Sequence, residues 1–196
     1  FGIGFDTATE VTLMVMAGQF FVNLVAIAPP WALFHRFGNV RGWTFGDIAM
    51  FFGLINVAFA IADFLSRGFD LFGTHFIRTG DFDRVLLRPR SAAVQLIGYE
   101  FRLARFGRFA QGLLIVAIAS ASLGLHWDAA KLALAAWTVT GAVALFFALM
   151  VFQAVLSFWT VESLEVMNTL TYGGVEAAQF PLGFYARWFR GFLTFV

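Results

Sequence analysis

Long runs without a charged residue constrain this chain more than any other feature. Residues 11–35, 109–127 and 132–161 contain no Asp, Glu, Lys or Arg. At about 1.5 Å per helical residue, such runs are long enough to cross a hydrocarbon core of about 30 Å. Candidate spans with few charges follow the same pattern, at 46–65, at 161–179 and from Gly191 onward. The sequence therefore predicts an all-α, polytopic integral membrane protein with about six transmembrane helices, five complete and the start of a sixth.

The composition excludes most other classes of protein. Hydrophobic residues make up 60% of the 196 residues and charged residues 13%, whereas a soluble domain is about 25% charged. A globule of this length cannot bury so much apolar surface, so a soluble enzyme, a disordered chain and a disulfide-stapled domain are excluded. The net charge of +1 argues against a nucleic-acid partner. With no Cys and no clustered His, we expect no metal site.

The chain is organised as one domain with one conspicuous loop. We find no internal repeat and no linker, so residues 1–196 form a single transmembrane domain. The first residue is not Met and the last five residues are an apolar run, so we expect both ends to be truncated. Eight of the thirteen basic residues lie between Arg67 and Arg108. By the positive-inside rule, the loop of about 67–106 is cytoplasmic.

That loop contains the run Gly80-Asp81-Phe82-Asp83-Arg84-Val85-Leu86-Leu87-Arg88-Pro89. Gly80 can end the preceding helix and Asp81 stands where an N-cap belongs. Phe82, Val85, Leu86 and Leu87 fall at helical spacing and predict one apolar stripe, and Pro89 ends the helix. A short amphipathic helix of this kind suits docking against another protein. It equally suits lying on a lipid surface with its Arg residues toward anionic headgroups, although two Asp residues count against attraction by lipid alone.

The run resembles the G-[ED]-[LF]-D-R-x-L-L-R-P signature of bacterial ABC type-2 permeases, the integral-membrane subunits of ABC exporters. The resemblance extends from about residue 40 to the end of the chain. Its other landmarks are Gly42-Trp43-Thr44, Phe158-Trp159, Phe180-Pro181 and Tyr185-Ala186-Arg187-Trp188. It implies a multi-pass permease of the bacterial inner membrane that is driven by ATP. The apolar, Phe-rich composition slightly favours an amphiphilic, lipid-like or drug-like substrate.

The resemblance also implies partners and site residues. A pair of ABC ATP-binding subunits would bind ATP and Mg, and a second permease, identical or homologous, would complete the membrane part, which is surrounded by lipid. The residues implied in coupling to the ATPase are Gly80, Asp81, Asp83, Arg84, Leu86, Leu87, Arg88 and Pro89. This chain has no G-x-x-x-x-G-K-[ST] phosphate loop and no catalytic constellation. We therefore expect a transport subunit that is not an enzyme and holds no cofactor of its own.

Three carboxylates leave other functions open. Glu162, Glu165 and Glu176 border or enter the fifth candidate span, and intramembrane carboxylates are often functional. They are the candidate residues for a stand-alone proton-coupled secondary carrier or a membrane-embedded enzyme. They equally suit the headgroup layer or a contact with an Arg of a partner. A structural subunit of a membrane complex, with the loop as a docking surface only, is the third possibility.

Overall fold

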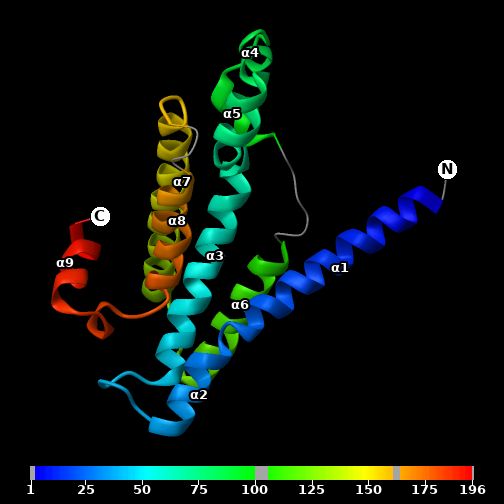
Figure 1. Ribbon diagram of the computed structural model, residues 1–196. Helices are drawn as coiled ribbons and strands as arrows, with labels where there is room; N and C mark the ends of the chain where they lie inside the picture. Colours follow the sequence, from blue (N-terminus) through cyan, green and yellow to red (C-terminus); the bar gives the residue numbers. More distant parts are fainter. Residues whose placement is uncertain (1–2, 100–105, 161–163, 196) are drawn as a thin grey trace.

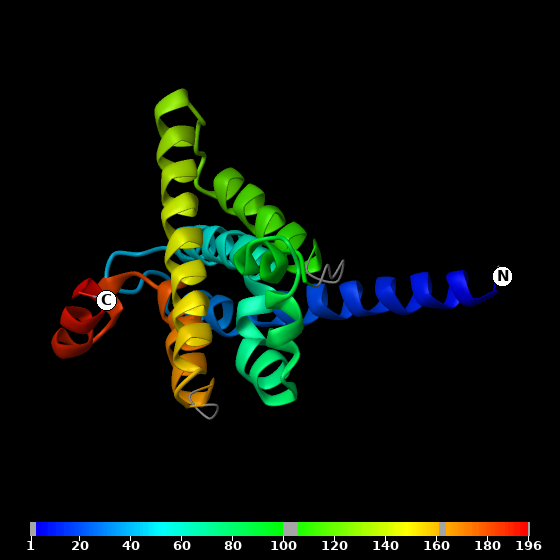
Figure 2. The same ribbon diagram turned by 90° about the horizontal axis from the view of Figure 1, so that it is seen from above.

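The computed structural model describes residues 3–99, 106–160 and 164–195, and all regular elements in these ranges are helical. Helix α3 is central, α1 projects away from it on one side and α9 stands apart on the other, as Figures 1 and 2 show. The elements are α1 (Ile3–Val25), α2 (Ala28–Phe37), α3 (Phe45–Asp70), η1 (Phe72–Ile77), α4 (Asp81–Leu86), α5 (Ala92–Ile97), α6 (Phe106–Ser122), α7 (Ala129–Leu156), α8 (Leu164–Ala178), η3 (Leu182–Phe184) and α9 (Arg187–Phe195).

Small residues allow α3 and α6 to pack closely. A Cβ atom on Gly53 of α3 would lie 2.7 Å from the Val116 side chain and 3.0 Å from the carbonyl oxygen of Gly112 on α6. Helices in membranes associate through such close approaches, because lipid gives them no hydrophobic driving force. On its other side α3 packs against α7, where Phe59 meets the ring of Phe146 edge-on at 5.3 Å. The core of the molecule therefore lies along α3.

The first candidate span consists of two helices. Helix α1 ends at Val25 and α2 begins at Ala28, with Pro29 and Pro30 in its first turn. A proline fits the first turn of a helix because the N–H it lacks would have no partner there, but it disrupts a helix interior. The proline pair thus starts a second helix within the uncharged run 11–35.

The second candidate span is longer than 46–65. Helix α3 begins at a capping box, in which the backbone N–H of Thr44 donates to Asp47 at 2.8 Å and the backbone N–H of Asp47 donates to the Thr44 hydroxyl at 3.3 Å. It ends at Asp70 and is followed directly by the π-helix η1. The cytoplasmic loop expected from about residue 67 therefore begins as a continuation of this helix.

The helices are those of a membrane protein. Two segments are long and apolar enough to cross a membrane, Phe45–Ile77 and Ala129–Leu156, and two shorter helical segments are also apolar, Thr9–Val22 and Phe106–Ser122. Large apolar side chains such as Met14 and Trp137 are exposed on α1 and α7. Contact of such side chains with lipid costs no free energy, whereas contact with water is unfavourable. The prediction of an all-α membrane protein is confirmed.

Candidate coupling site

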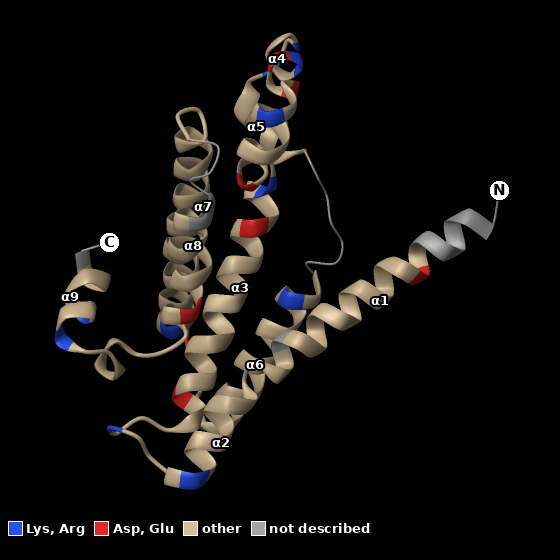
Figure 3. Cartoon of the chain, in the orientation of Figure 1, with Lys and Arg blue, Asp and Glu red and all other residues tan. Residues whose placement is uncertain are grey.

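The run from Gly80 to Pro89 lies beyond the C-terminal end of α3, away from the helices that pack around α3 (Figure 1). Helices α4 and α5 form this end, and we call residues 78–97 the tip. Figure 3 shows that charged residues gather at the tip, while long parts of α1, α3, α6 and α7 carry few. The tip is therefore the most polar part of a largely apolar molecule.

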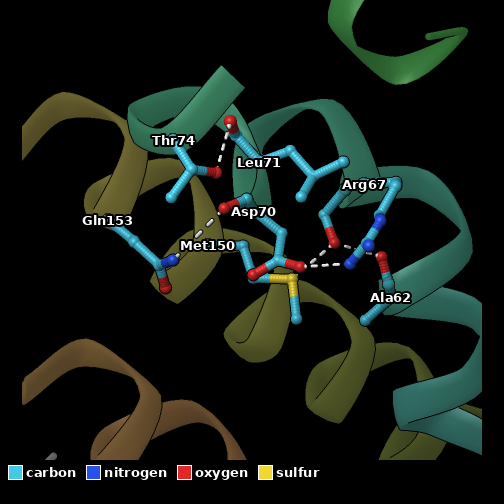
Figure 4. A network of polar contacts seen from close by, with 8 residues as sticks. Ala62, Arg67, Asp70, Leu71, Thr74, Met150 and Gln153 are labelled. Carbon is cyan, nitrogen blue, oxygen red and sulfur yellow. Dashed lines mark hydrogen bonds and ion pairs between the residues drawn. The ribbon is translucent and has the colours of Figure 1, made fainter. Parts of the chain in front are cut away.

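A network of polar contacts joins the base of the tip to α7, as Figure 4 shows. On α3 the guanidinium of Arg67 lies 2.5 Å from the carboxylate of Asp70, and Asp70 is buried. From α7 the side-chain amide of Gln153 donates to the carbonyl oxygen of Asp70 at 3.4 Å. This carbonyl lies where the α-helix gives way to the π-helix η1, and π-turns interrupt the regular hydrogen bonding of a helix. Gln153 thus supports the chain at the point where its helical geometry changes.

Gly80, rather than Asp81, occupies the N-cap of α4. Gly80 has a φ of +75°, a conformation that suits glycine, and Asp81 is the first residue of the helix. The carboxylate of Asp81 accepts a hydrogen bond from the Thr79 hydroxyl at 2.8 Å and forms an ion pair with Arg84 at 3.2 Å. These two contacts hold the pKa of Asp81 below its usual range, and the hydrogen bond from the Thr79 hydroxyl has the larger effect. Asp81 thus fixes the turn into α4 through its neighbours, and the expected cap is displaced by one residue.

The inner side of α4 packs against aromatic rings. The ring of Phe82 lies 4.8 Å from that of Phe72 in η1 and 5.6 Å from that of Phe158, just after α7. Val85 on the same side is buried. Edge-on aromatic pairs contribute about 0.5–1.5 kcal/mol beyond the area they bury. The inner side therefore fixes α4 to both α3 and α7.

The outer side of α4 is exposed and apolar. Leu86 and Leu87 are 59% and 85% exposed, so they do not join Phe82 and Val85 on one buried stripe as the sequence suggested. Leu86 is the last residue of α4 and Leu87 is its C-cap, so both lie where the helix ends. The other implied coupling residues that are exposed around them are Asp83, Arg84, Arg88 and Pro89.

Two residues that the sequence did not single out hold the rest of the tip. The side-chain amide of Gln95 on α5 donates to the carbonyl oxygens of Val85 and Arg90, both at 3.0 Å, and so fixes the turn after α4. A Cβ atom on Gly68 of α3 would lie 2.1 Å from the carbonyl oxygen of Leu96 on α5. Only glycine allows the two backbones to come this close. A single Gly or Gln in a helix carries no signal that would have revealed these roles.

The three carboxylates do not form a described cluster. Glu162 lies outside the described residues, and Glu165 falls in the first turn of α8, where its side chain is not described. Glu176 lies eleven residues further along the same helix, about 16 Å away along its axis. Within the described ranges, no group of three or more His, Asp or Glu side chains could hold a metal ion.

One comparison with known proteins identifies the family of the chain. A family model described as ABC-2 family transporter protein matches residues 13–196, which include α3, the whole tip and α6 to α9. No curated protein and no solved structure matches the chain. In this family the membrane permease associates with an ATP-binding subunit and is not itself catalytic. The chain belongs to the ABC-2 transporter family, as a membrane permease of an ABC transporter.

Proposed function

We propose that this chain is the permease subunit of an ATP-driven exporter and that the tip is its contact with a separate ATPase. The observation that carries the proposal is the exposure of Leu86 and Leu87 at the end of a short helix. This helix is held in place by the contact of Phe82 with Phe72. Burying a leucine side chain is worth about 1.5–3 kcal/mol. Two adjacent leucines held outward on a rigid mount are best explained by a partner that covers them.

The contacts behind α4 suggest how movement passes into the membrane. A shift of the tip is transmitted through Phe82 to η1 and to Phe158, and through Gln153 to the junction of α3 and α7. ATP binding can change the membrane domain only if the ATPase binds the tip differently in the two states. Closing of the ATPase pair would then tilt α3 and α7 together and change access to a path between the paired permeases.

The wider assembly follows the same proposal. Two ATP-binding subunits hold ATP and Mg, and two permeases, identical or homologous, form the path in the bacterial inner membrane. The exposed apolar side chains of α1, among them Val11 and Met14, are available to lipid and to the second permease. The substrate we propose is an amphiphilic, lipid-like or drug-like molecule, since the permease presents so much apolar surface.

Two experiments test this function. The full protein is purified from its native membrane in mild detergent, and mass spectrometry identifies the proteins that copurify with it. We expect a stoichiometric subunit with a Walker A phosphate loop.

In the second experiment, Asp83→Arg reverses an exposed charge of α4 and should abolish transport while the ATPase still binds ATP. Unchanged transport by Asp83→Arg would argue against coupling through α4, and so would the absence of an ATPase in preparations that keep other membrane complexes intact.

A further inference from the structure

Two consecutive aromatic residues, Phe158 and Trp159, lie in the turn that follows α7. Their side chains are 54% and 76% exposed. The backbone N–H groups of the two residues donate to the carbonyl oxygens of Val155 and Leu156, at 3.3 and 3.0 Å. The end of α7 therefore holds the turn, which presents a large exposed tryptophan. Exposed apolar side chains that lie together mark contacts with a protein or a membrane, so this turn requires an explanation.

The turn packs against the base of the tip. The ring of Phe158 lies 5.2 Å from that of Phe72 in η1 and 5.6 Å from that of Phe82 in α4. Figures 1 and 2 both show the end of α7 beside the elements that lead into the tip. Leu86 follows Phe82 by four residues, about 6 Å further along α4. The turn and the exposed leucines of the tip are therefore neighbours.

The position of the turn along α3 places it beyond the hydrocarbon of a membrane. Helix α3 has 26 residues and is therefore about 39 Å long, whereas a hydrocarbon core is about 30 Å thick. The π-helix η1 continues from the C-terminal end of α3, and Phe158 packs against η1. Lipid chains therefore do not cover Trp159. Two other covers are open to it, the headgroup layer, where tryptophan is common, and the surface of a protein.

The surroundings of the turn favour a protein surface over lipid headgroups. Asp81 and Asp83 of the neighbouring α4 would face the same anionic headgroups as the turn, and like charges repel. Leu86 and Leu87 also require an apolar cover, which a headgroup layer does not supply. One partner that covers these leucines would reach the turn as well, because the two surfaces adjoin.

We propose that Trp159 is an anchor of the ATPase contact and inserts into an apolar recess of the ATPase subunit, so that residues 157–160 form a second docking element beside the tip. The inference rests on the proposed function, since it adds a surface for the same partner. Tryptophan is enriched among the few residues that dominate binding at protein interfaces. Phe158 holds the turn against η1 and α4, so a movement of the ATPase at Trp159 reaches α3 and α7 together.

A binding assay between the full-length permease in nanodiscs and the purified ATPase subunit tests the proposal. Trp159→Ala should weaken the affinity about tenfold, as loss of an anchoring tryptophan does, and Trp159→Phe should keep part of the affinity. Trp188→Ala is the matched control, because Trp188 is 77% exposed and lies on α9, away from the tip (Figure 1). It should leave the affinity unchanged. An unchanged affinity of Trp159→Ala, in protein with a wild-type melting temperature, overturns the proposal.

Photo-crosslinking distinguishes the ATPase from the headgroup layer as the cover of Trp159. A photoreactive amino acid at position 159 should crosslink to the ATPase subunit in the native membrane, and the same amino acid at position 188 should not. If Trp159 lies among headgroups, position 159 crosslinks to lipid only, and Trp159→Ala and Trp188→Ala have equal effects on ATPase binding. Either of these two results overturns the proposal.

Leu87→Ala, measured in the same binding assay, separates this inference from the proposed function. Weaker binding by Leu87→Ala but not by Trp159→Ala overturns the second docking element and leaves the contact through the tip intact. Weaker binding by Trp159→Ala but not by Leu87→Ala supports the second docking element and argues against the tip. Weaker binding by both variants supports both surfaces, and unchanged binding by both overturns both.

Discussion

The inner and outer sides of α4 carry similar apolar residues in different surroundings. Phe82 and Val85 face the aromatic rings of η1 and the end of α7, and Val85 is 9% exposed. Leu86 and Leu87, at the end of the helix, are largely uncovered. Two tasks are separated over the six residues from Phe82 to Leu87, fixing the tip in place and presenting a surface. Changes on the inner side should alter stability, whereas changes on the outer side should alter transport.

The largest effect is expected on the outer side. Replacing Leu86 and Leu87 together by Asp introduces two charges where the ATPase is proposed to bind, and should reduce transport more than tenfold. The melting temperature should stay unchanged, because both side chains are already exposed. Val94→Asp, at an equally exposed position on α5, is the control and should have a smaller effect. Transport is measured in vesicles and the melting temperature by thermal unfolding. Wild-type transport by the double variant would contradict the proposal that the ATPase binds these leucines.

On the inner side, Phe82→Ala should destabilise the protein by about 2–3 kcal/mol. It removes contacts with the rings of Phe72 and Phe158, and large-to-small changes at packed aromatic positions cost this much or more. The fall in melting temperature is the measurement, and transport should decline only as far as folded protein is lost. A full loss of transport at a wild-type melting temperature would show that the two sides of α4 do not have separate tasks.

The close packing of α3 against α5 is tested by replacing Gly68, with Gly141 as the control. Gly68→Ala places a Cβ atom against the backbone of Leu96, and overpacking of this kind costs about 1–3 kcal/mol. Gly141→Ala, in α7, meets nothing within 4 Å and should be neutral or stabilising by up to about 1 kcal/mol, since alanine favours the helix. Thermal unfolding of both variants should therefore move the melting temperature in opposite directions. Equal shifts would show that α3 and α5 are not closely packed.

The smallest effect concerns the turn into α4. The pKa of Asp81 is lowered in the folded protein by Thr79 and Arg84, so its charged form stabilises the fold at neutral pH. That contribution is present above the usual pKa of 3.8 and is lost as the pH falls through the lower folded value. Asp81→Asn should therefore give a slightly lower melting temperature at pH 7 and no difference from wild type well below pH 3.8. A difference that persists at low pH would point to a cause other than this carboxylate.

The sequence predicted the helices better than their contacts. The uncharged runs at 109–127 and 132–161 correspond to α6 and α7, which begin and end a few residues earlier, because side chains such as Lys131 are compatible with a first helical turn. Gly80 was predicted to separate two helices and does. The exposure of Leu86 and Leu87 could not be predicted, since periodicity groups them with Phe82 and Val85 on one stripe and does not show what covers each part of that stripe.

Contacts between distant parts of the chain gave no signal in the sequence. Gln153 and Asp70 are 83 residues apart, and neither position looks unusual in its own helix. Arg108, counted with the cytoplasmic basic residues, has its guanidinium carbon 4.8 Å from the centre of the Phe59 ring on α3, a contact that the charge rule does not consider. The coupling roles of the tip residues stay predictions, since they depend on molecules that this chain must meet.

Photo-crosslinking from Leu87 and from Phe82 tests whether the exposed part of the tip contacts the ATPase. A photoreactive amino acid is placed at Leu87 in one sample and at Phe82 in another, and each full-length protein is illuminated in its native membrane. We predict a crosslink to the ATPase subunit from position 87 that changes in yield when ATP is added, and none from position 82. No crosslink from position 87, or equal crosslinking from both positions, would contradict the assignment of the outer side of α4 as the surface that couples this permease to its ATPase.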